Sequence, residues 1–238
     1  GLLNLAKAGT LGLGRASDIA SDIMSGFGLK AEDMGRISDV LTATFTRSNT
    51  TLGMLGETMK FVAPVAKTAG LSIEETSAFA GILANSGIKA SQAGTTLRAM
   101  LLRLGAPGNK AREILDGLGI TLADSDGNLR NVVDLMSEVA GATEDLGSAK
   151  KLNILKEVFG EEPAAGVSAL LAKEGQAGIK SLLESVSNSG GEASKIAARM
   201  DATFAGRMAG FNSAVESFKI TVGNALLPTL SSLVQSFT

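Results

Sequence analysis

The stretch Gly87-Ile-Lys-Ala-Ser-Gln-Ala-Gly-Thr-Thr-Leu-Arg-Ala-Met-Leu-Leu-Arg-Leu104 decides the fold class that this chain is expected to adopt. Its larger apolar residues recur at the spacing of one α-helical face, and small residues on the same stripe let another helix approach closely. Leu102 projects to a different side, which favours neighbours on both sides of the helix. Gly105 and Pro107 then end it. The predicted packing residues are Gly87, Gly94, Leu97, Leu101 and Leu104, with Met100 on the same face and Arg98 flanking it.

Composition favours packed helices and argues against several classes of function. The chain of 238 residues has 29 Gly and 9 Phe but no Trp, Tyr or Cys, so small aliphatic residues make up most of its apolar mass. That composition suits helices in close contact better than a sandwich of large strand residues. The net charge is −2, from 22 basic and 24 acidic residues, without a basic run. Because a nucleic-acid binder needs a basic footprint, we expect no nucleic-acid partner and in particular no sequence-specific one.

The two ends of the chain set expectations about processing and membranes. The chain starts at Gly1 without a basic region and cleavage site, so we expect no signal peptide and a portion of a longer protein. A membrane-spanning helix needs about 18 or more mainly apolar residues, and the sequence has no such run. Residues 220–238 are uncharged, but polar residues and Pro228 dilute their apolar content. A buried or truncated helix is therefore preferred there over a membrane segment.

Apolar residues at helical spacing predict several helices in the first half of the chain. One covers 16–27, a second begins near Ala31 and a third begins near Leu52. Pro64 is expected to kink or restart the third helix, since proline removes a backbone hydrogen bond. Residues 72–75 read Ser-Ile-Glu-Glu, the spacing of a capping box, and predict the start of a further helix.

Two of these regions are similar to each other in sequence. Gly28-Leu-Lys-Ala-x-x-x-Gly35 matches Gly87-Ile-Lys-Ala-x-x-x-Gly94, an offset of 59 residues (87 minus 28). Apolar residues ahead of each stretch align as well. Two helical hairpins descended from one unit would give this pattern, and so would chance similarity between two helices rich in Ala and Gly.

The sequence period changes between residues 118 and 131. Ile120 and Leu122 alternate, Asp126-Gly127 marks a turn and Leu129 resumes on the other side, which predicts a small β-hairpin near 118–131. Helical spacing returns on both sides of this segment. The helices predicted there cover 110–115, 131–139, 148–159, a segment starting at Pro163, and 179–186.

A long amphipathic helix is predicted for residues 192–238, after the linker Asn188-Ser-Gly-Gly191. Its large apolar residues are spaced by three or four positions, as in a long packing seam, and a packing seam is preferred over a cofactor site. We interpret this C-terminal seam as a surface for self-association or for a partner helix, and we expect the helix to continue into a longer chain. The C-terminal seam consists of Met200, Phe204, Met208, Phe211, Val215 and Phe218.

Together these segments predict an all-α fold of packed helical hairpins with one small β-hairpin and a long C-terminal helix. We expect three parts. N-terminal helical hairpins occupy 1–68, a core helical domain with the β-hairpin occupies 69–187, and the long helix occupies 192–238.

No group of residues points to catalysis, a cofactor or a metal. His is absent, which removes the commonest general base and most zinc sites. Ser-x-x-Lys occurs at 86–89 and 148–151, but the partner motifs of the penicillin-recognising hydrolases are missing, so helix caps beside solvated lysines are preferred. Asp124-Ser-Asp-Gly-Asn128 begins like a calcium loop but lacks the required later Gly and Glu. Paired carboxylates such as Glu74-Glu75 point apart on a helix. We predict that the chain is not an enzyme.

The opening stretch also resembles a known family. Residues 87–104 are similar to the core signature of tail tape measure proteins from long-tailed bacteriophages and prophages. The resemblance covers roughly residues 10 to 230, and a match in several parts is more specific than one short motif. Its other parts are Phe61-Val-Ala-Pro-Val-Ala66, Gly70-Leu-Ser-Ile-Glu-Glu-Thr76, Leu118-Gly-Ile120, Asp126-Gly-Asn128 and Phe159-Gly160.

This resemblance implies a structural role in a phage tail. Proteins of the family run along the lumen of the tail tube, where their length sets tail length, and they act in DNA ejection. The resemblance implies a homo-oligomer (a trimer or hexamer), tail tube, tail tip and tail assembly chaperone partners, and host membrane contact as a further possibility. The implied locations are the tail tube lumen of the virion and the host cytoplasm during assembly. One alternative is an envelope-penetrating, membrane-active segment, and a less favoured one is a peptidoglycan hydrolase.

Overall fold

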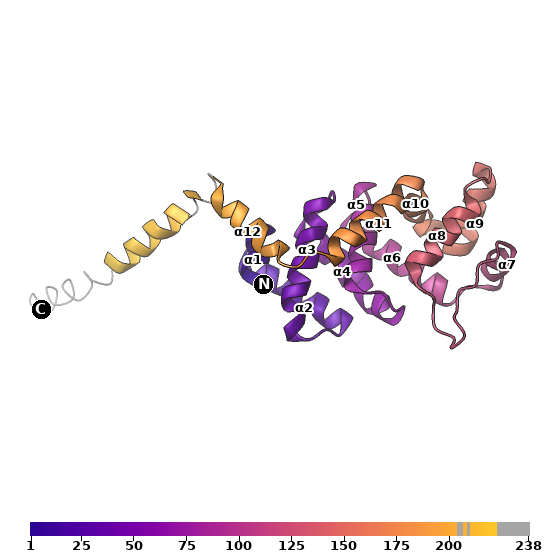
Figure 1. The fold of residues 1–238 in the computed structure, drawn as a ribbon, viewed down its shortest axis with the longest axis horizontal. Helices are drawn as coiled ribbons and strands as arrows, with labels where there is room; N and C mark the ends of the chain where they lie inside the picture. Colours follow the sequence, from indigo (N-terminus) through magenta and orange to yellow (C-terminus); the bar gives the residue numbers. More distant parts are fainter. Residues whose placement is uncertain (204–206, 209, 223–238) are drawn as a thin grey trace, which may run out of the picture. The chain divides into compact units, whose positions relative to one another are not determined.

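The computed structural model describes residues 1–203, 207–208 and 210–222, and these residues are mostly α-helical (Figure 1). Residues 1–194 form one compact unit, and residues 195–238 form a second. The described residues contain no β-strand, so the all-α prediction is confirmed. The predicted division into 1–68, 69–187 and 192–238 stays a prediction.

Short turns connect most helices of the described part of the chain, and a longer loop joins α7 to α8. Their bounds are α1 (Leu2–Ala8), α2 (Leu13–Phe27), the 3₁₀ helix η1 (Ala31–Asp33), α3 (Met34–Arg47), α4 (Leu52–Thr68), α5 (Ile73–Asn85), α6 (Ala90–Gly105), α7 (Asn109–Gly117), α8 (Val132–Thr143), α9 (Ser148–Phe159), α10 (Glu161–Leu171), α11 (Lys173–Ser187) and α12 (Glu192–Ala202). The capping box predicted at the start of α5 is present. The Ser72 hydroxyl accepts the Glu75 backbone N–H at 3.1 Å, and the Glu75 carboxylate accepts the Ser72 backbone N–H at 2.8 Å.

Helices α2, α4 and α6 form one row of parallel helices. A Cβ atom on Gly56 of α4 would lie 2.9 Å from the side chain of Ile19 in α2, and one on Gly26 of α2 would lie 2.7 Å from the Cβ of Ala63 in α4. The N-terminal parts of the two helices therefore meet, as do their C-terminal parts. Helix α6 packs along the other side of α4, so each member of the row contacts the helix two elements further along the chain.

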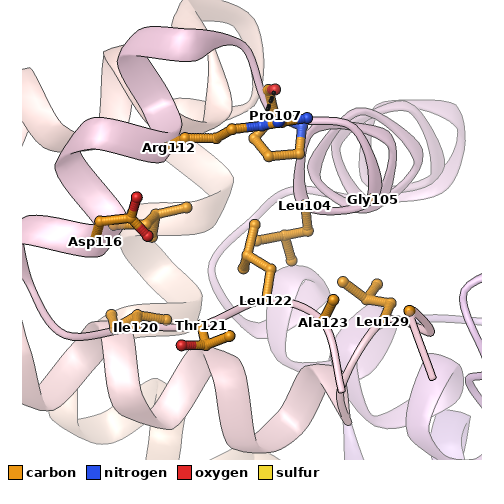
Figure 2. A pocket seen from close by; sticks show the side chains of 12 residues that line it. Leu104, Gly105, Pro107, Arg112, Asp116, Ile120, Thr121, Leu122, Ala123 and Leu129 are labelled. Carbon is orange, nitrogen blue, oxygen red and sulfur yellow. Dashed lines mark hydrogen bonds between the residues drawn. The ribbon is translucent and has the colours of Figure 1, made fainter. Parts of the chain in front are cut away.

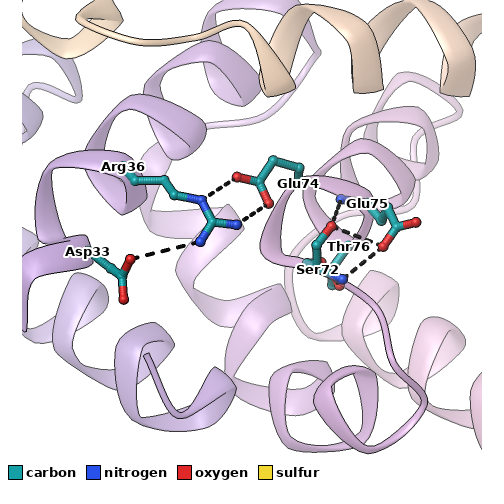
Figure 3. Close-up of polar contacts among 6 residues, drawn as sticks. All are labelled: Asp33, Arg36, Ser72, Glu74, Glu75 and Thr76. Carbon is teal, nitrogen blue, oxygen red and sulfur yellow. Dashed lines mark hydrogen bonds and ion pairs between the residues drawn. The ribbon is translucent and has the colours of Figure 1, made fainter. Parts of the chain in front are cut away.

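Helices α3 and α5 form a second parallel row. The Arg36 guanidinium donates two hydrogen bonds to the Glu74 carboxylate, each 2.7 Å long, and Asp33 lies 4.0 Å from the same guanidinium (Figure 3). The hydrogen bond to Glu74 raises the pKa of Arg36 above its ordinary value. At the other end of the row, the Asn49 backbone N–H donates to the Asn85 side chain at 2.7 Å. Elements one hairpin apart in sequence thus lie side by side, as in helical repeat proteins.

One turn recurs between these helices. A residue with positive φ follows a helix, and the N–H of the next, apolar residue bonds to the carbonyl five positions back, which is the Schellman arrangement. Positive φ strains any side chain with a Cβ atom, so glycine stands at four of the five positions. The pairs of positive-φ and apolar residues are Thr10 with Leu11, Gly28 with Leu29, Gly70 with Leu71, Gly87 with Ile88, and Gly119 with Ile120.

The internal sequence similarity at an offset of 59 residues corresponds to this turn. Gly28 (φ 63°) and Gly87 (φ 86°) have the same backbone role, and both stretches lead into a helix. The helices that precede them lie in different rows, because α2 packs on α4 whereas α5 packs on α3. The sequence similarity at 59 residues therefore reflects how helices end and not how they pack. Equivalent positions of neighbouring helices in a parallel row are closer in sequence, since Arg36 and Glu74 are 38 positions apart.

The second half of the first unit returns over the second row. Helix α10 packs on α6 and α5, and α11 packs on α5 and α3, so the chain runs back toward its N-terminal helices (Figure 1). Small residues make this packing close. A Cβ atom on Gly81 of α5 would lie 2.5 Å from Leu182, and one on Gly178 of α11 would lie 2.7 Å from Ile82.

The start of α12 is held by the N-terminal helices through a group of contacts that we call the α12 clasp. The two carboxylate oxygens of Asp39 accept the backbone N–H groups of Gly191 and Ala193 at 2.8 and 2.9 Å. A carboxylate from α3 therefore caps α12, where the free N–H groups of a helix start favour negative charge. The other members of the clasp are the pairs Arg47 with Glu192 at 2.9 Å and Asn4 with Ser194 at 2.7 Å.

The predicted β-hairpin near 118–131 is not formed. The chain does turn back at Asp126-Gly127, but within this stretch, which the structure describes throughout, the strand-like pairing is limited to an isolated antiparallel bridge between Ala123 and Leu129. An isolated two-stranded pair is marginal in water without further strands. The Asp124 side chain also accepts the backbone N–H groups of Asp126 and Asn128 at 3.0 and 2.9 Å, which closes a compact loop instead of a ladder.

Two helix predictions also need correction. Pro64 is predicted to kink or restart its helix, and the restart does not occur, because α4 runs through Pro64 to Thr68 as one helix. Pro64 is exposed, so water can reach the backbone groups that it leaves unpaired. The predicted continuous helix of 192–238 is interrupted, because α12 ends at Ala202 and Thr203 is not helical. The Thr203 hydroxyl donates to the Met200 carbonyl at 2.6 Å and so competes with the helical pattern.

Candidate functional site

The predicted packing residues of α6 lie against α4. A Cβ atom on Gly94 would lie 2.5 Å from the Thr58 carbonyl oxygen and 2.8 Å from the Phe61 side chain, so only glycine fits at this crossing. The Thr58 hydroxyl donates to the Ala90 carbonyl at 3.0 Å and fixes the first turn of α6, where Ala90 has a φ of 51°. Leu97, Leu101 and Leu104 are buried, with exposures of 1%, 2% and 1%.

The two remaining motif residues have different surroundings. Gly87 lies in the turn before α6, where its positive φ is needed, and a Cβ atom added to it would meet no atom within 4 Å beyond its own neighbours in the chain. Glycine is therefore required there by backbone conformation and not by space. Arg98 is exposed on the outer side of α6. The motif is thus mainly a turn and a buried helix face, to which Arg98 adds a solvent-facing charge.

The described side chains of the C-terminal seam are exposed or half-buried. Met208, Phe211 and Phe218 have exposures of 43%, 62% and 69%. Met200 and Val215 are half-buried. Phe204 lies outside the described residues. From Met208 onward the spacing is three, four and three residues, which is the spacing of a coiled-coil face.

A groove that the sequence did not predict lies around the loop of residues 121–130. One cavity of about 350 Å³ lies between this loop, the end of α6 and α7, and a second of about 700 Å³ lies between the loop and the C-terminal ends of α4 and α6. Gly105, Gly127 and Leu129 line both cavities, so they are two parts of one site, which we call the loop groove. In Figure 2, Leu104 and Leu122 extend into the first cavity from facing elements.

The larger cavity of the loop groove is lined by uncharged residues, and the smaller one has two charged side chains in its lining, Arg112 and Asp116. Asp116 lines the first cavity and has no ion pair in the described residues. Arg112 lines the same cavity, but its Nε donates to the Pro107 carbonyl at 3.1 Å (Figure 2). Arg130 donates to the Glu138 carboxylate and to the Thr121 carbonyl, and the hydrogen bond to Glu138 raises its pKa.

One sequence signal could have indicated this groove. Gly119-Ile-Thr-Leu122 repeats the turn pattern that precedes α3, α5 and α6, yet no helical spacing follows it. The next helix starts only at Val132, and the loop before it lies beside the C-terminal ends of α4 and α6. A break in a repeating pattern is a frequent place for binding surfaces.

The residues weighed for catalysis have structural contacts. Ser86 donates to the Ile82 carbonyl at 3.3 Å, and Lys89 precedes the first turn of α6. Glu74 binds Arg36, whereas Glu75 binds the start of its own helix and accepts a hydrogen bond of 2.8 Å from Asn131. Within the described ranges, no group of three or more metal-ligating side chains is present, and no helix there is both long and apolar enough to cross a membrane.

Two parallel rows of helices with one recurring turn give the first unit an architecture like that of helical repeat proteins. The chain belongs to the family of phage-related minor tail proteins, whose family model matches residues 1–160. It is also 32% identical over all 238 of its residues to the tape measure protein of Pneumococcus phage Dp-1. It is 32% identical over 217 residues, 90% of the chain, to a probable tape measure protein of Escherichia phage P2. The resemblance to tape measure proteins is confirmed.

The chain is much shorter than these relatives. It spans 21% of the Dp-1 protein and 27% of the P2 protein. No solved structure matches it. The fold described above therefore corresponds to about a quarter of the length of these relatives.

Proposed function

We propose that this chain is a structural and assembly portion of a phage tail tape measure protein and that it works through helix–helix contacts. It helps to set tail length, organises the tail tube and tip, and has a role in DNA ejection. Similarity to two tape measure proteins over nearly the whole chain carries this proposal. A structural role is also supported by the contacts of Ser86 and Glu74, two of the residues weighed for catalysis, which bind a helix carbonyl and Arg36.

The fold supports a division of labour within such a protein. An α-helix rises about 1.5 Å per residue, so an extended helix can act as a ruler. The first unit folds back on itself and closes with the α12 clasp, which does not suit a ruler. We therefore assign the first unit to assembly, and the C-terminal seam to the part that continues along the tail.

Self-association is the proposed task of the C-terminal seam. Exposed Phe211 and Phe218 side chains lose contact with water when they pack against copies of the same helix. A trimer or hexamer would match the symmetry implied for the tail. The proposed partners are tail tube proteins, tail tip proteins and tail assembly chaperones, with the virion tail as the final location and the host cytoplasm as the place of assembly.

Light scattering on the purified chain tests this arrangement. We expect an oligomer that becomes monomeric when residues 192–238 are removed, since the truncation deletes the C-terminal seam. A monomer before and after truncation would contradict self-association through that seam. In the phage, an in-frame deletion in a helical part of the gene tests the ruler function. Tails measured by electron microscopy should shorten by about 1.5 Å for each helical residue removed.

An envelope-penetrating role is the alternative, favoured by the uncharged sequence of residues 220–238. Release of a dye from lipid vesicles by the chain, lost on removal of 220–238, would support it. Vesicles that stay sealed would argue against it. A peptidoglycan hydrolase remains the less favoured possibility, and a zymogram with purified peptidoglycan tests it.

A further inference from the structure

We propose that the loop groove is a docking site for a short segment of a partner protein that carries apolar side chains beside a basic one. The partner's apolar side chains enter the two cavities, and its cation pairs with the acidic residues of the loop and α7. This inference does not rest on the proposed tail function, because binding is measured with the purified chain alone.

The shape of the groove suits two anchoring side chains. The cavities of about 350 and 700 Å³ lie on the two sides of Gly127 and Leu129 and meet at Gly105. The wall of the larger cavity includes Leu102, which is 54% exposed although the opposite face of its helix, α6, is buried. Water in contact with such a wall is released when an apolar side chain binds.

The loop is held in shape before any partner arrives. One Asp124 oxygen accepts two backbone N–H groups of its own loop, and the Arg130 backbone N–H donates to the Leu122 carbonyl at 2.9 Å. The Arg130 guanidinium ties the base of the loop to the Thr121 carbonyl and to Glu138 of α8. A preformed site loses little conformational entropy on binding.

The charged residues near the loop groove indicate which charge the partner segment should carry. Two of the three cations between residues 109 and 131 pair with a carboxylate, whereas Arg112 keeps its charge because its partner is a backbone carbonyl, so among the described residues of this stretch three unpaired carboxylates stand against one unpaired cation. Lys110 pairs with Glu113, and Arg112 and Arg130 bind as described above. The remaining carboxylates, Asp116, Asp124 and Asp126, form no ion pair in the described part of the chain. A cationic segment therefore complements this end of the unit, and an acidic segment is repelled.

Gly105 offers a variant that blocks the groove without disturbing the fold. It lines both cavities, no atom lies within 4 Å of a Cβ built on it, and its φ is not in the left-handed region. Gly105→Leu therefore fills the groove from a helix end that tolerates a side chain. Gly14→Leu is the matched control, because Gly14 of α2 also has nothing within 4 Å of a Cβ position.

The test selects peptides from a random peptide library on the wild-type chain, with removal of those that also bind the Gly105→Leu variant. We expect surviving peptides with at least two apolar residues and a Lys or Arg. Because the chain has no Trp or Tyr, a Trp in the selected peptide reports binding by its own fluorescence. We expect affinity to fall at least about tenfold in Gly105→Leu and to stay unchanged in Gly14→Leu.

Charge is tested with Asp116→Asn combined with Asp126→Asn. We expect weaker binding and a smaller effect of salt on the affinity, since fewer charges are paired. The proposal is overturned if no peptide distinguishes wild type from Gly105→Leu, or if the selected peptides are acidic. It is also overturned if light scattering shows that Gly105→Leu dissociates an oligomer, because a second copy would then cover the groove. Circular dichroism confirms that each variant is folded.

Discussion

Two apolar seams in this chain share the spacing of a helical face but have opposite surroundings. On α6, Leu97 and Leu101 recur at helical spacing and are 1% and 2% exposed. In the second unit, Phe211 and Phe218 also recur at helical spacing, yet they are 62% and 69% exposed. The difference does not lie in the seams themselves. It lies in α4, which presents Thr58 and a continuous face to α6.

This comparison shows what an apolar stripe means. A stripe identifies the face of a helix that needs a cover, because apolar surface is costly in water. It does not identify the cover, which can be the same chain, another copy or a different protein. For α6 the cover is present in the first unit, and for the C-terminal seam we propose that copies of the chain supply it.

The largest difference between the seams is expected for truncation of a large side chain. Leu97→Ala should lower the free energy of unfolding by about 2–5 kcal/mol, because it leaves a cavity between α6 and α4. Phe218→Ala should change the same quantity by less than about 0.5 kcal/mol in the monomer, since the side chain is mostly exposed. Urea unfolding followed by circular dichroism measures both. An equal loss of unfolding free energy in the two variants would show that the two seams are buried to the same extent.

Replacing a glycine by alanine should have a smaller effect, which is destabilising beside the α6 seam and stabilising beside the C-terminal seam. Gly94→Ala should cost about 1–3 kcal/mol of stability, because the new Cβ atom overlaps the Thr58 carbonyl oxygen. Gly210→Ala should favour helix by about 0.5–1 kcal/mol, since alanine has the higher helix propensity. A Cβ on Gly210 meets nothing within 4 Å in the described residues. Urea unfolding measures the first effect and helix content by circular dichroism the second. Two changes of the same sign would contradict the comparison.

Loss of the carboxylate in the α12 clasp should have a moderate effect on the free energy of unfolding. Asp39→Ala removes two hydrogen bonds to backbone N–H groups and should cost about 1–2 kcal/mol. Hydrogen exchange at the amides of Gly191 and Ala193 should become faster, while amides in α5 keep their protection. Asp22→Ala, which alters an exposed carboxylate of α2, is the control. Unchanged exchange at Gly191 would mean that Asp39 does not hold α12.

The smallest effect is expected from a surface ion pair. Lys156 forms an ion pair with Glu161, and the hydrogen bond between them lowers the pKa of Glu161 and raises that of Lys156. A lowered carboxyl pKa adds stability above the ordinary pKa of Glu, and this stability is lost as the pH falls through the lower, folded value. Both groups are solvent-exposed, so the effect on the melting temperature should be too small to detect. In Lys156→Met, an NMR titration should show the Glu161 pKa returning toward its ordinary value. An unchanged titration would remove Lys156 as the cause.

Much of the first unit could be predicted from local sequence. The Ser-x-x-Glu capping box at 72–75, the Gly87 turn and the buried face of Leu97 to Leu104 follow from hydrogen-bonding chemistry and helical geometry. The β-hairpin prediction was wrong because Ile120 and Leu122 alternate within a loop that Asp124 closes by its own hydrogen bonds. The loop groove was missed because its walls come from α4, α6 and α7, and no local pattern joins them.

The sequence by itself determined the fold class, the positions of most helices, the face that each one buries and the family to which the chain belongs. These properties depend on residues within a few positions of one another, where backbone geometry and side-chain spacing act directly. Only the tertiary structure decided the parallel rows, the groove and the clasp that joins Asn4 to Ser194 across 190 positions. Such contacts depend on how whole helices pack, and packing selects among partners that the local sequence leaves equivalent.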